Sequence, residues 1–201
     1  MKQHHRHSIR LPGYDYSQNG FYFLTICTRN RECLFGQIRN GMMFLSEIGE
    51  IVDLCWQEIP CHFPHVVVRE YVIMPNHIHG IIEICNHIVG ANNYSPLQQP
   101  SNTSQQPVWA NNYSPLQRPS NTSMALALTR PTGTSRTVGS VVRGIKIGVT
   151  HRMGHSPWQR NYYEHIIRNT TAYQNIVQYM VQNPMKWEED CFYCKTGDVV
   201  T

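Results

Sequence analysis

The sequence has few of the features that mark membrane-bound or secreted proteins. Among its 201 residues there is no run of about eighteen apolar residues, which excludes a transmembrane helix. The first seven residues, Met1 to His7, lead into no apolar segment, so we expect no secretory signal. The seven cysteines are scattered and odd in number, which argues against a disulfide framework and favours reduced thiols in a cytoplasm. We therefore expect a soluble protein with no membrane partner.

Acidic residues are absent from a long central interval. None occurs between Glu83 and Glu164, although the whole chain carries thirteen. The basic residues in the same interval are Arg118, Arg130, Arg136, Arg143, Lys146, Arg152 and Arg160. This excess of positive charge predicts a surface that meets phosphate groups, and the alternative is a basic loop surrounded by solvent. The net charge of +4 does not separate the two interpretations.

Apolar residues are also scarce between residues 86 and 135, where Asn, Ser, Thr, Gln and Pro predominate. Residues 91–104 recur as residues 110–123 with one change, since Gln99 corresponds to Arg118. A tract of this composition buries too little apolar surface to order itself, and two copies do not make a solenoid. We therefore expect one domain over residues 1–201, with a flexible low-complexity insertion at about 86–135.

The rest of the chain alternates between strand and helix patterns. Aromatic and β-branched residues predict strands at 21–28, 65–74 and 77–85, with a short partner strand at 42–45. Apolar residues at helical spacing predict helices at 47–58, 137–151 and 171–182. Ser46 is the expected N-cap of the first helix, Pro60 closes it, and Asn183-Pro184 ends the last helix. This order predicts an α+β fold, a ferredoxin-like antiparallel sheet with helices packed on one face.

The most informative motif is His77-Ile78-His79, at the start of a predicted strand. Successive strand side chains point to opposite faces, so both imidazoles lie on one face and can reach one metal ion. Imidazoles suit Zn, Mn, Ni or Fe better than Mg, but Mg binds where waters and phosphate oxygens complete its shell. A single histidine near a strand start is more often a structural residue, and it is the pair that favours a metal site.

The predicted last helix carries a second candidate group. Tyr179 and Asn183 are four residues apart and share one helical face, so a phenol and an amide oxygen lie side by side. A tyrosine with a pKa near 10 attacks only when a metal, a base or a positive charge activates it. Three other tyrosines are candidates for this role: Tyr162, Tyr163 and Tyr173. Packing against the sheet is an adequate role for Tyr162 and Tyr163. Tyr173 lacks an amide partner on its helical face, because the residue four positions later is valine.

Several strings together resemble one family, the bacterial REP-associated tyrosine transposases within the HUH superfamily of single-strand transposases. The matching strings are residues 8–16, 22–31, 72–80, 142–146, 158–169 and 179–184. They cover most of the chain outside residues 86–135. The repeat-bearing insertion departs from the pattern, but relatives commonly carry a variable segment at this place.

The resemblance implies a ferredoxin-like catalytic domain that binds single-stranded DNA folded into a palindromic hairpin. It implies a divalent metal, Mg or Mn, held by His77 and His79, with Asn183 in the place of a third ligand. Tyr179 is then the nucleophile that becomes joined to the 5′ phosphate and leaves a free 3′ hydroxyl. Some relatives carry Gln at the third position. A bacterial cytoplasm, with association to the nucleoid when DNA is bound, is the expected location.

Basic and aromatic residues are the expected DNA contacts. Arg143, Lys146 and Arg160 are assigned to phosphates, and Arg10 and Tyr14 to the hairpin. Tyr16 is expected to stack on an unpaired base. For each of these residues the alternative is an ordinary solvated surface position.

Two other functions compete with this hypothesis. One is a non-catalytic protein, derived from a transposase, that binds nucleic-acid hairpins through the same basic surface. The other is a metal hydrolase that uses activated water instead of tyrosine. The sequence also leaves open whether the protein is a monomer or a homodimer in which the partner supplies the tyrosine, which hairpin and metal it binds, and whether it mobilises itself or acts on chromosomal repeats.

Overall fold

A four-stranded antiparallel sheet organises the chain in the computed structural model, which describes residues 13–85 and 135–193. Its strands in spatial order are β4 (Val66–Met74), β5 (His77–Ile84), β1 (Gly20–Cys27) and β6 (Tyr163–Ile167). The helices are α1 (Glu47–Gln57), α2 (Ile59–His62), α3 (Val138–Met153) and α4 (Thr170–Gln182), with short 3-10 turns η1 (Arg29–Arg31) and η3 (Trp187–Glu189). The order βαββαβ, with β5 and β1 in the centre, confirms the predicted ferredoxin-like α+β fold.

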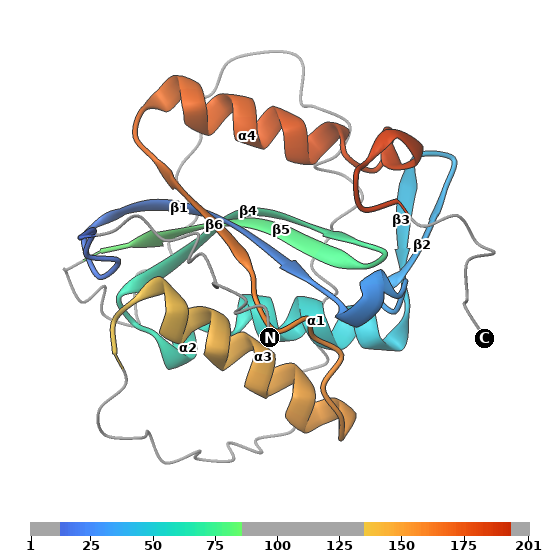
Figure 1. Cartoon of the computed structure of the whole chain (residues 1–201), viewed down its shortest axis with the longest axis horizontal. Helices are drawn as coiled ribbons and strands as arrows, with labels where there is room; N and C mark the ends of the chain where they lie inside the picture. The colour runs from blue at the N-terminus through green and yellow to red at the C-terminus, as the bar shows by residue number, and fades with distance from the viewer. Residues whose placement is uncertain (1–12, 86–134, 194–201) are drawn as a thin grey trace, which may run out of the picture.

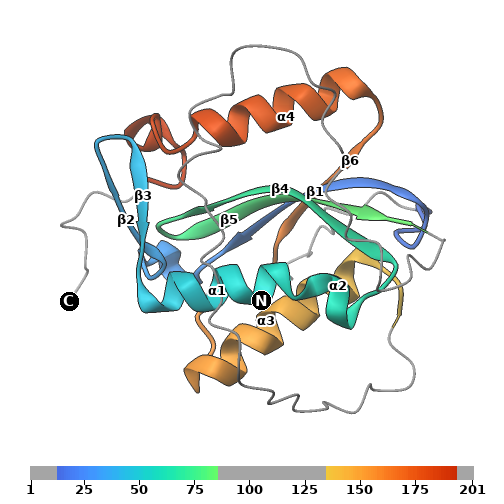
Figure 2. The same cartoon turned by 180° about the vertical axis from the view of Figure 1, so that it is seen from behind.

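The helices cover both faces of the sheet. Helices α1, α2 and α3 lie on one side, and α4 crosses the other side alone (Figure 1). The view from behind shows the same three layers (Figure 2). The expectation that all helices pack on one face was therefore wrong. The physical reason is that the central strands are buried on both faces, so a single layer of helices would leave apolar side chains in water.

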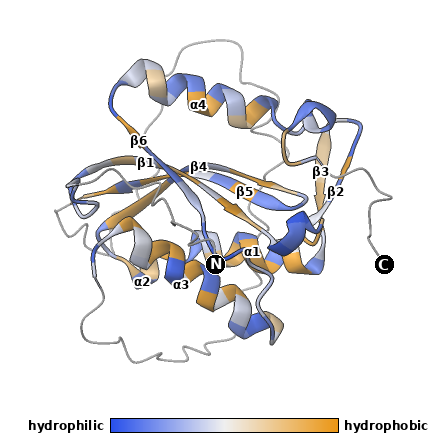
Figure 3. Cartoon of the chain, in the orientation of Figure 1, coloured by the Kyte–Doolittle hydropathy of each residue, from blue (hydrophilic) through white to orange (hydrophobic). Residues whose placement is uncertain are grey.

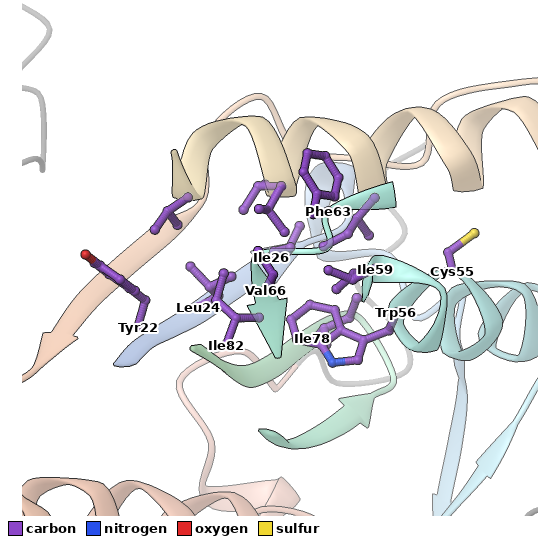
Figure 4. Close-up of a cluster of buried hydrophobic side chains, with 14 of the residues drawn as sticks. Tyr22, Leu24, Ile26, Cys55, Trp56, Ile59, Phe63, Val66, Ile78 and Ile82 are labelled. Carbon is purple, nitrogen blue, oxygen red and sulfur yellow. The ribbon is translucent and has the colours of Figure 1, made fainter. Parts of the chain in front are cut away.

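Alternation along β1 divides the core into two parts. Tyr22, Leu24 and Ile26 point toward α1 and α3, where they join a large cluster, whereas Phe23 points toward α4 in a smaller one. Figure 4 shows the large cluster, with Trp56 of α1 against the sheet. The strands and helices accordingly show mixed hydrophobic and hydrophilic colours along their length (Figure 3). Each large apolar side chain buried in this way stabilises the fold by about 1.5–3 kcal/mol.

The predicted N-cap Ser46 begins α1, and α3 begins with a side-chain cap that was not predicted. The Ser46 hydroxyl accepts a hydrogen bond from the Gly49 amide at 3.1 Å, and Thr137 caps α3 in the same way. Helix α1 ends at Gln57, before the expected position, and Pro60 lies instead in the first turn of α2, where its missing N–H is not needed. Gly154, with a φ of 76°, ends α3 in the left-handed conformation that glycine adopts without strain.

Two strands differ from expectation. Strand β3 (Met42–Leu45) exists, but it pairs with β2 (Gly36–Arg39) in a separate two-stranded sheet and not with the first strand. Strand β6 was missed, although it forms the edge of the main sheet beside β1. Its sequence lacks the usual strand pattern, since a charged residue, Glu164, takes an inward position. Glu164 is buried there and accepts a hydrogen bond from the Tyr162 hydroxyl at 2.9 Å.

Two negative expectations concern covalent links and membranes. Within residues 13–85 and 135–193 the cysteines are all free. No helix in the same ranges has the length and apolar character needed to cross a bilayer. The predicted insertion at 86–135, including both repeat copies, lies almost wholly outside the described residues.

Candidate metal and tyrosine site

The two histidines lie at the start of the central strand β5, and their side chains face α4. His77 pairs with Cys27 and His79 with Thr25 across the β1–β5 ladder, so both imidazoles leave the same face of the sheet. Their Nε2 atoms lie 3.0 Å apart, and the ring centroids are separated by 4.4 Å. Both side chains are almost completely buried, with 0% and 2% exposure. The structure thus brings together the histidine pair that the strand pattern predicts.

A buried asparagine fixes the orientation of the first imidazole. The Asn76 amide nitrogen donates to the carbonyls of Arg31 at 3.0 Å and Phe192 at 2.8 Å. The Asn76 Oδ1 therefore faces His77 Nδ1, at 2.9 Å, and it can only accept. His77 must carry its proton on Nδ1, which leaves the Nε2 lone pair directed into the site.

The second imidazole has an adaptable partner. His79 Nδ1 lies 2.9 Å from the Thr25 hydroxyl, which is able either to donate or to accept. This contact permits the tautomer in which the Nε2 of His79 is also unprotonated. Burial lowers the pKa of both imidazoles to about 3, with the nearby Arg31 charge contributing for His77 and the His77 ring contributing for His79. Both rings are therefore neutral near pH 7, as metal coordination requires.

Tyr179 reaches the histidines from α4. Its hydroxyl lies 3.1 Å from His79 Nε2, and the two rings are 5.2 Å apart. The tyrosine remains 44% exposed, so the phenol borders both the buried histidines and the solvent. Burial, then the carboxylate of Asp190 and the thiol of Cys191, raise the pKa of Tyr179 to about 12, and a hydrogen bond with Asn183 opposes this. The phenol is protonated at neutral pH and needs a nearby positive charge to react.

The competing tyrosines have hydroxyl contacts elsewhere. Tyr162 donates to Glu164, and Tyr173 donates to Glu70 at the far strand β4. Tyr163 is half exposed at the start of β6. Of the four candidates, Tyr179 is the one whose hydroxyl contacts the histidine pair within the described part of the chain.

Asn183 closes the site at the C-terminal end of α4. It is 3% exposed, and its Nδ2 donates to the Asp190 carboxylate at 2.9 Å. The Asn183 Oδ1 atom is buried and has no hydrogen-bond partner in the described structure. An orphaned buried oxygen normally lowers stability, and it is explained if the oxygen faces an ion. Together with two converging imidazole lone pairs, it fits a divalent cation held by this donor set.

Asp190 was missed by the sequence reasoning. One ligand atom from each of His77, His79 and Asp190 lies within 4.8 Å of the others. The aspartate follows η3, beyond the Asn183-Pro184 helix end, and no spacing relates it to β5. Only the return of the chain over the sheet brings it to the histidines.

Next to this site lies an open basic cavity of about 840 Å³. Its lining residues come from η1, α3 and the segment before β6: Arg29, Asn30, Arg31, Lys146, Ser156, Trp158, Gln159 and Arg160. Arg31 belongs to both regions, since its guanidinium also donates to the Cys191 carbonyl at 2.8 Å and lies over the Phe192 ring. Lys146 and Arg160, two of the DNA contacts expected from the sequence, line this cavity, and Arg29 and Arg31 line it too but were not among the residues named from the sequence.

The other predicted DNA contacts are distributed differently. Arg143 is exposed on α3 but does not line the cavity, and Lys146 donates to the carbonyls of Gln159 at 2.7 Å and Asn161 at 3.2 Å. Tyr14 is half-buried with its hydroxyl 3.3 Å from that of Tyr22.

Tyr16 lies in the core at 7% exposure, so the expectation that its ring stacks on a base is wrong for this conformation. Arg10 lies outside the described residues.

Comparison with known proteins identifies both a close relative and a structural neighbour. An uncharacterized protein of Haemophilus influenzae is 44% identical over 195 residues, which are 94% of each chain. No family model matches the sequence. The solved structure of a REP-associated tyrosine transposase bound to a REP hairpin superposes with a TM-score of 0.53 at 21% identity, covering 90% of this chain and 74% of that one. At this identity the likeness shows a shared fold.

Proposed function

Because the chain belongs to the same family as the Haemophilus influenzae protein and has the fold of a REP-associated tyrosine transposase, we propose that it cleaves and rejoins single-stranded DNA at palindromic hairpins. The observation that carries this proposal is the 3.1 Å contact between the Tyr179 hydroxyl and His79 Nε2. A tyrosine and a histidine pair suited to a divalent metal meet at one point, although His79 and Tyr179 are 100 residues apart in the sequence. A single chain supplies all three side chains, which favours a complete site in each monomer.

In the proposed reaction, the Tyr179 oxygen attacks the phosphorus of one phosphodiester. The phenol gives up its proton to solvent water as a bond forms between its oxygen and the 5′ phosphate, the bond to the 3′ oxygen breaks, and the 3′ oxygen leaves as a hydroxyl after taking up a proton from solvent water. A bound Mg or Mn ion would supply the positive charge that neutralises the phosphate and lowers the phenol pKa. The reverse attack by another 3′ hydroxyl restores the phenol and rejoins the DNA without an external energy source.

The protein side chains contribute orientation and electrostatics. In this proposal His77, His79 and Asn183 would hold the cation, and the contacts of Asn76 with His77 and of Thr25 with His79 orient the two imidazoles. Helix α4 sets the direction of the phenol, so that attack begins from a defined geometry. The neighbouring basic cavity offers positive charge to the DNA backbone beyond the cleaved bond. In this proposal the protein acts in a bacterial cytoplasm, where single-stranded hairpins arise on the chromosome.

The test uses the full-length protein with a labelled hairpin oligonucleotide and Mg or Mn ions. We expect a covalent protein–DNA adduct that resists denaturing electrophoresis, and we expect Tyr179→Phe to reduce its formation by at least about a thousandfold, because the nucleophile is removed. Tyr173→Phe, on the same helix but bonded to Glu70, is the matched control and should keep the adduct.

An adduct that persists in Tyr179→Phe contradicts the proposal. Hairpin binding without any adduct on the native protein supports the non-catalytic alternative, and DNA cleavage by Tyr179→Phe without an adduct supports the hydrolase alternative.

A further inference from the structure

The segment that follows α4 returns over the histidine pair. Trp187 of η3 is 9% exposed, and its ring lies 6.0 Å from that of His77. The Phe192 ring lies closer, at 4.5 Å, and its backbone carbonyl accepts a hydrogen bond from Asn76. Residues 187–193 therefore pack directly against the start of β5. Asp190 is carried into the site by these contacts.

Both oxygens of the Asp190 carboxylate are held in place. Oδ1 accepts a hydrogen bond from the Phe192 amide at 2.7 Å, and Oδ2 accepts one from Asn183 Nδ2 at 2.9 Å. The ion pairs in the described ranges join Arg69 to Glu83 and Arg152 to Glu58, so neither involves this carboxylate. A positioned anion thus stands beside two neutral imidazoles.

The Asp190 carboxylate lies close to both histidines. One ligand atom from each of His77, His79 and Asp190 lies within 4.8 Å of the others. Donor atoms that converge at this separation from two strand positions and one later segment fit a single divalent cation between them.

We propose that Asp190 is a direct ligand of the divalent cation held by His77 and His79, supplied by the segment after α4. Two imidazoles and one carboxylate form a donor set that suits Mn and other first-row divalent metals. Asn183 then has two functions, since its Nδ2 orients the carboxylate and its Oδ1 stays directed to the ion. Cation binding also ties residues 187–193 to β5. This assignment rests on the proposed metal-dependent function.

The experiment measures Mn binding to the full-length protein without DNA, by calorimetry and by electron paramagnetic resonance of the free ion. We expect Asp190→Ala to raise the dissociation constant for Mn by about tenfold or more, which is the range seen when groups of a metal site are removed. The matched control is Glu188→Gln, which removes an exposed carboxylate two residues away and should bind Mn as the native protein does.

Unfolding by urea without metal separates a ligand from a structural residue. We expect the midpoint of Asp190→Asn, which keeps the side-chain shape, to stay near the native value while its Mn affinity falls. The assignment is overturned if both Asp190 variants bind Mn as tightly as the native protein. It is also overturned if Glu188→Gln loses as much Mn affinity as the Asp190 variants do. These outcomes do not depend on DNA chemistry, so a native protein that binds Mn but forms no adduct refutes the proposed function and leaves this assignment intact.

Discussion

At the scale of single residues, the string from His77 to Gly80 serves two faces of the sheet at once. His77 and His79 point toward α4, whereas Ile78 and Gly80 point toward α1 and α3. The indole of Trp56 occupies the space that a side chain at position 80 would fill, so this position requires glycine. A Cβ on Gly80 would lie 2.2 Å from Trp56 Cζ2, inside any acceptable contact distance. The packing under the metal site therefore depends on this glycine.

Replacing that glycine predicts a loss of stability with a clear control. We expect Gly80→Ala to lower the free energy of unfolding by about 1–3 kcal/mol, because the buried indole has to move. Gly148→Ala on α3 places its Cβ at an ordinary 3.4 Å from Cys55 Sγ, so it should be neutral or stabilise by up to about 1 kcal/mol. Urea denaturation of both variants measures the difference, and equal midpoints would show that Trp56 adapts freely.

At the scale of secondary-structure elements, α4 has the decisive position. It lies alone on its face of the sheet and buries only Met180 fully, in a small cluster with Phe23, Ile81 and Ile167. Tyr179 is adjacent to Met180 in the helix, so the packing of Met180 on the sheet also determines the position of the Tyr179 phenol. An element with so small a core depends more than the others on its own caps.

The cap of α4 is Asn169, whose Oδ1 accepts a hydrogen bond from the Ala172 amide at 2.8 Å. We expect Asn169→Ala to lower the free energy of unfolding by about 1 kcal/mol, since the amide loses its partner. We also expect slower formation of the DNA adduct, because a frayed α4 holds Tyr179 less firmly. Denaturant titration and a time course of adduct formation measure the two effects. Asn169→Asp keeps the cap and should behave as the native protein; an equal loss in both variants would argue against capping.

At the scale of the whole molecule, charge gathers where three separate segments meet. Arg29 and Arg31 follow β1, Lys146 lies on α3, and Arg160 precedes β6, yet all line one cavity beside the metal and tyrosine site. Under the proposed function, this positive charge would direct a polyanion such as DNA toward Tyr179. The central interval without acidic residues contributes two of these four cations.

DNA binding should therefore depend on salt through these residues. We expect Arg160→Ala to weaken hairpin binding and to lower the slope of log K against log salt by about 0.7–0.9, the loss of one phosphate contact. Fluorescence anisotropy between about 50 and 200 mM salt measures the slope. Arg69→Ala, which removes a cation already paired with Glu83, should leave the slope unchanged. A native slope for Arg160→Ala would place the DNA elsewhere.

The local part of the structure follows from the sequence. Alternation with period two places His77 and His79 on one face of a strand, and spacing by four places Tyr179 beside Asn183, because both periodicities are properties of the backbone alone. The strands β1, β3, β4 and β5, the three long helices and the Ser46 cap follow from the same local rules, whereas β2 and β6 were not predicted. These rules sufficed for the α+β class and for the histidine pair, but not for the order of the strands in the sheet, which includes the missed strand β6.

Only the tertiary structure decided which groups meet. Local periodicity does not say which face of the sheet α4 covers; burial of both faces of β1 and β5 does, and it places the Tyr179 hydroxyl 3.1 Å from His79. Asp190 and Arg31 reach the site through contacts between residues more than a hundred positions apart, for which no local pattern exists. The sequence by itself determined the chemistry available to the protein, and the packing of the chain on both sides of the sheet determined where that chemistry is assembled.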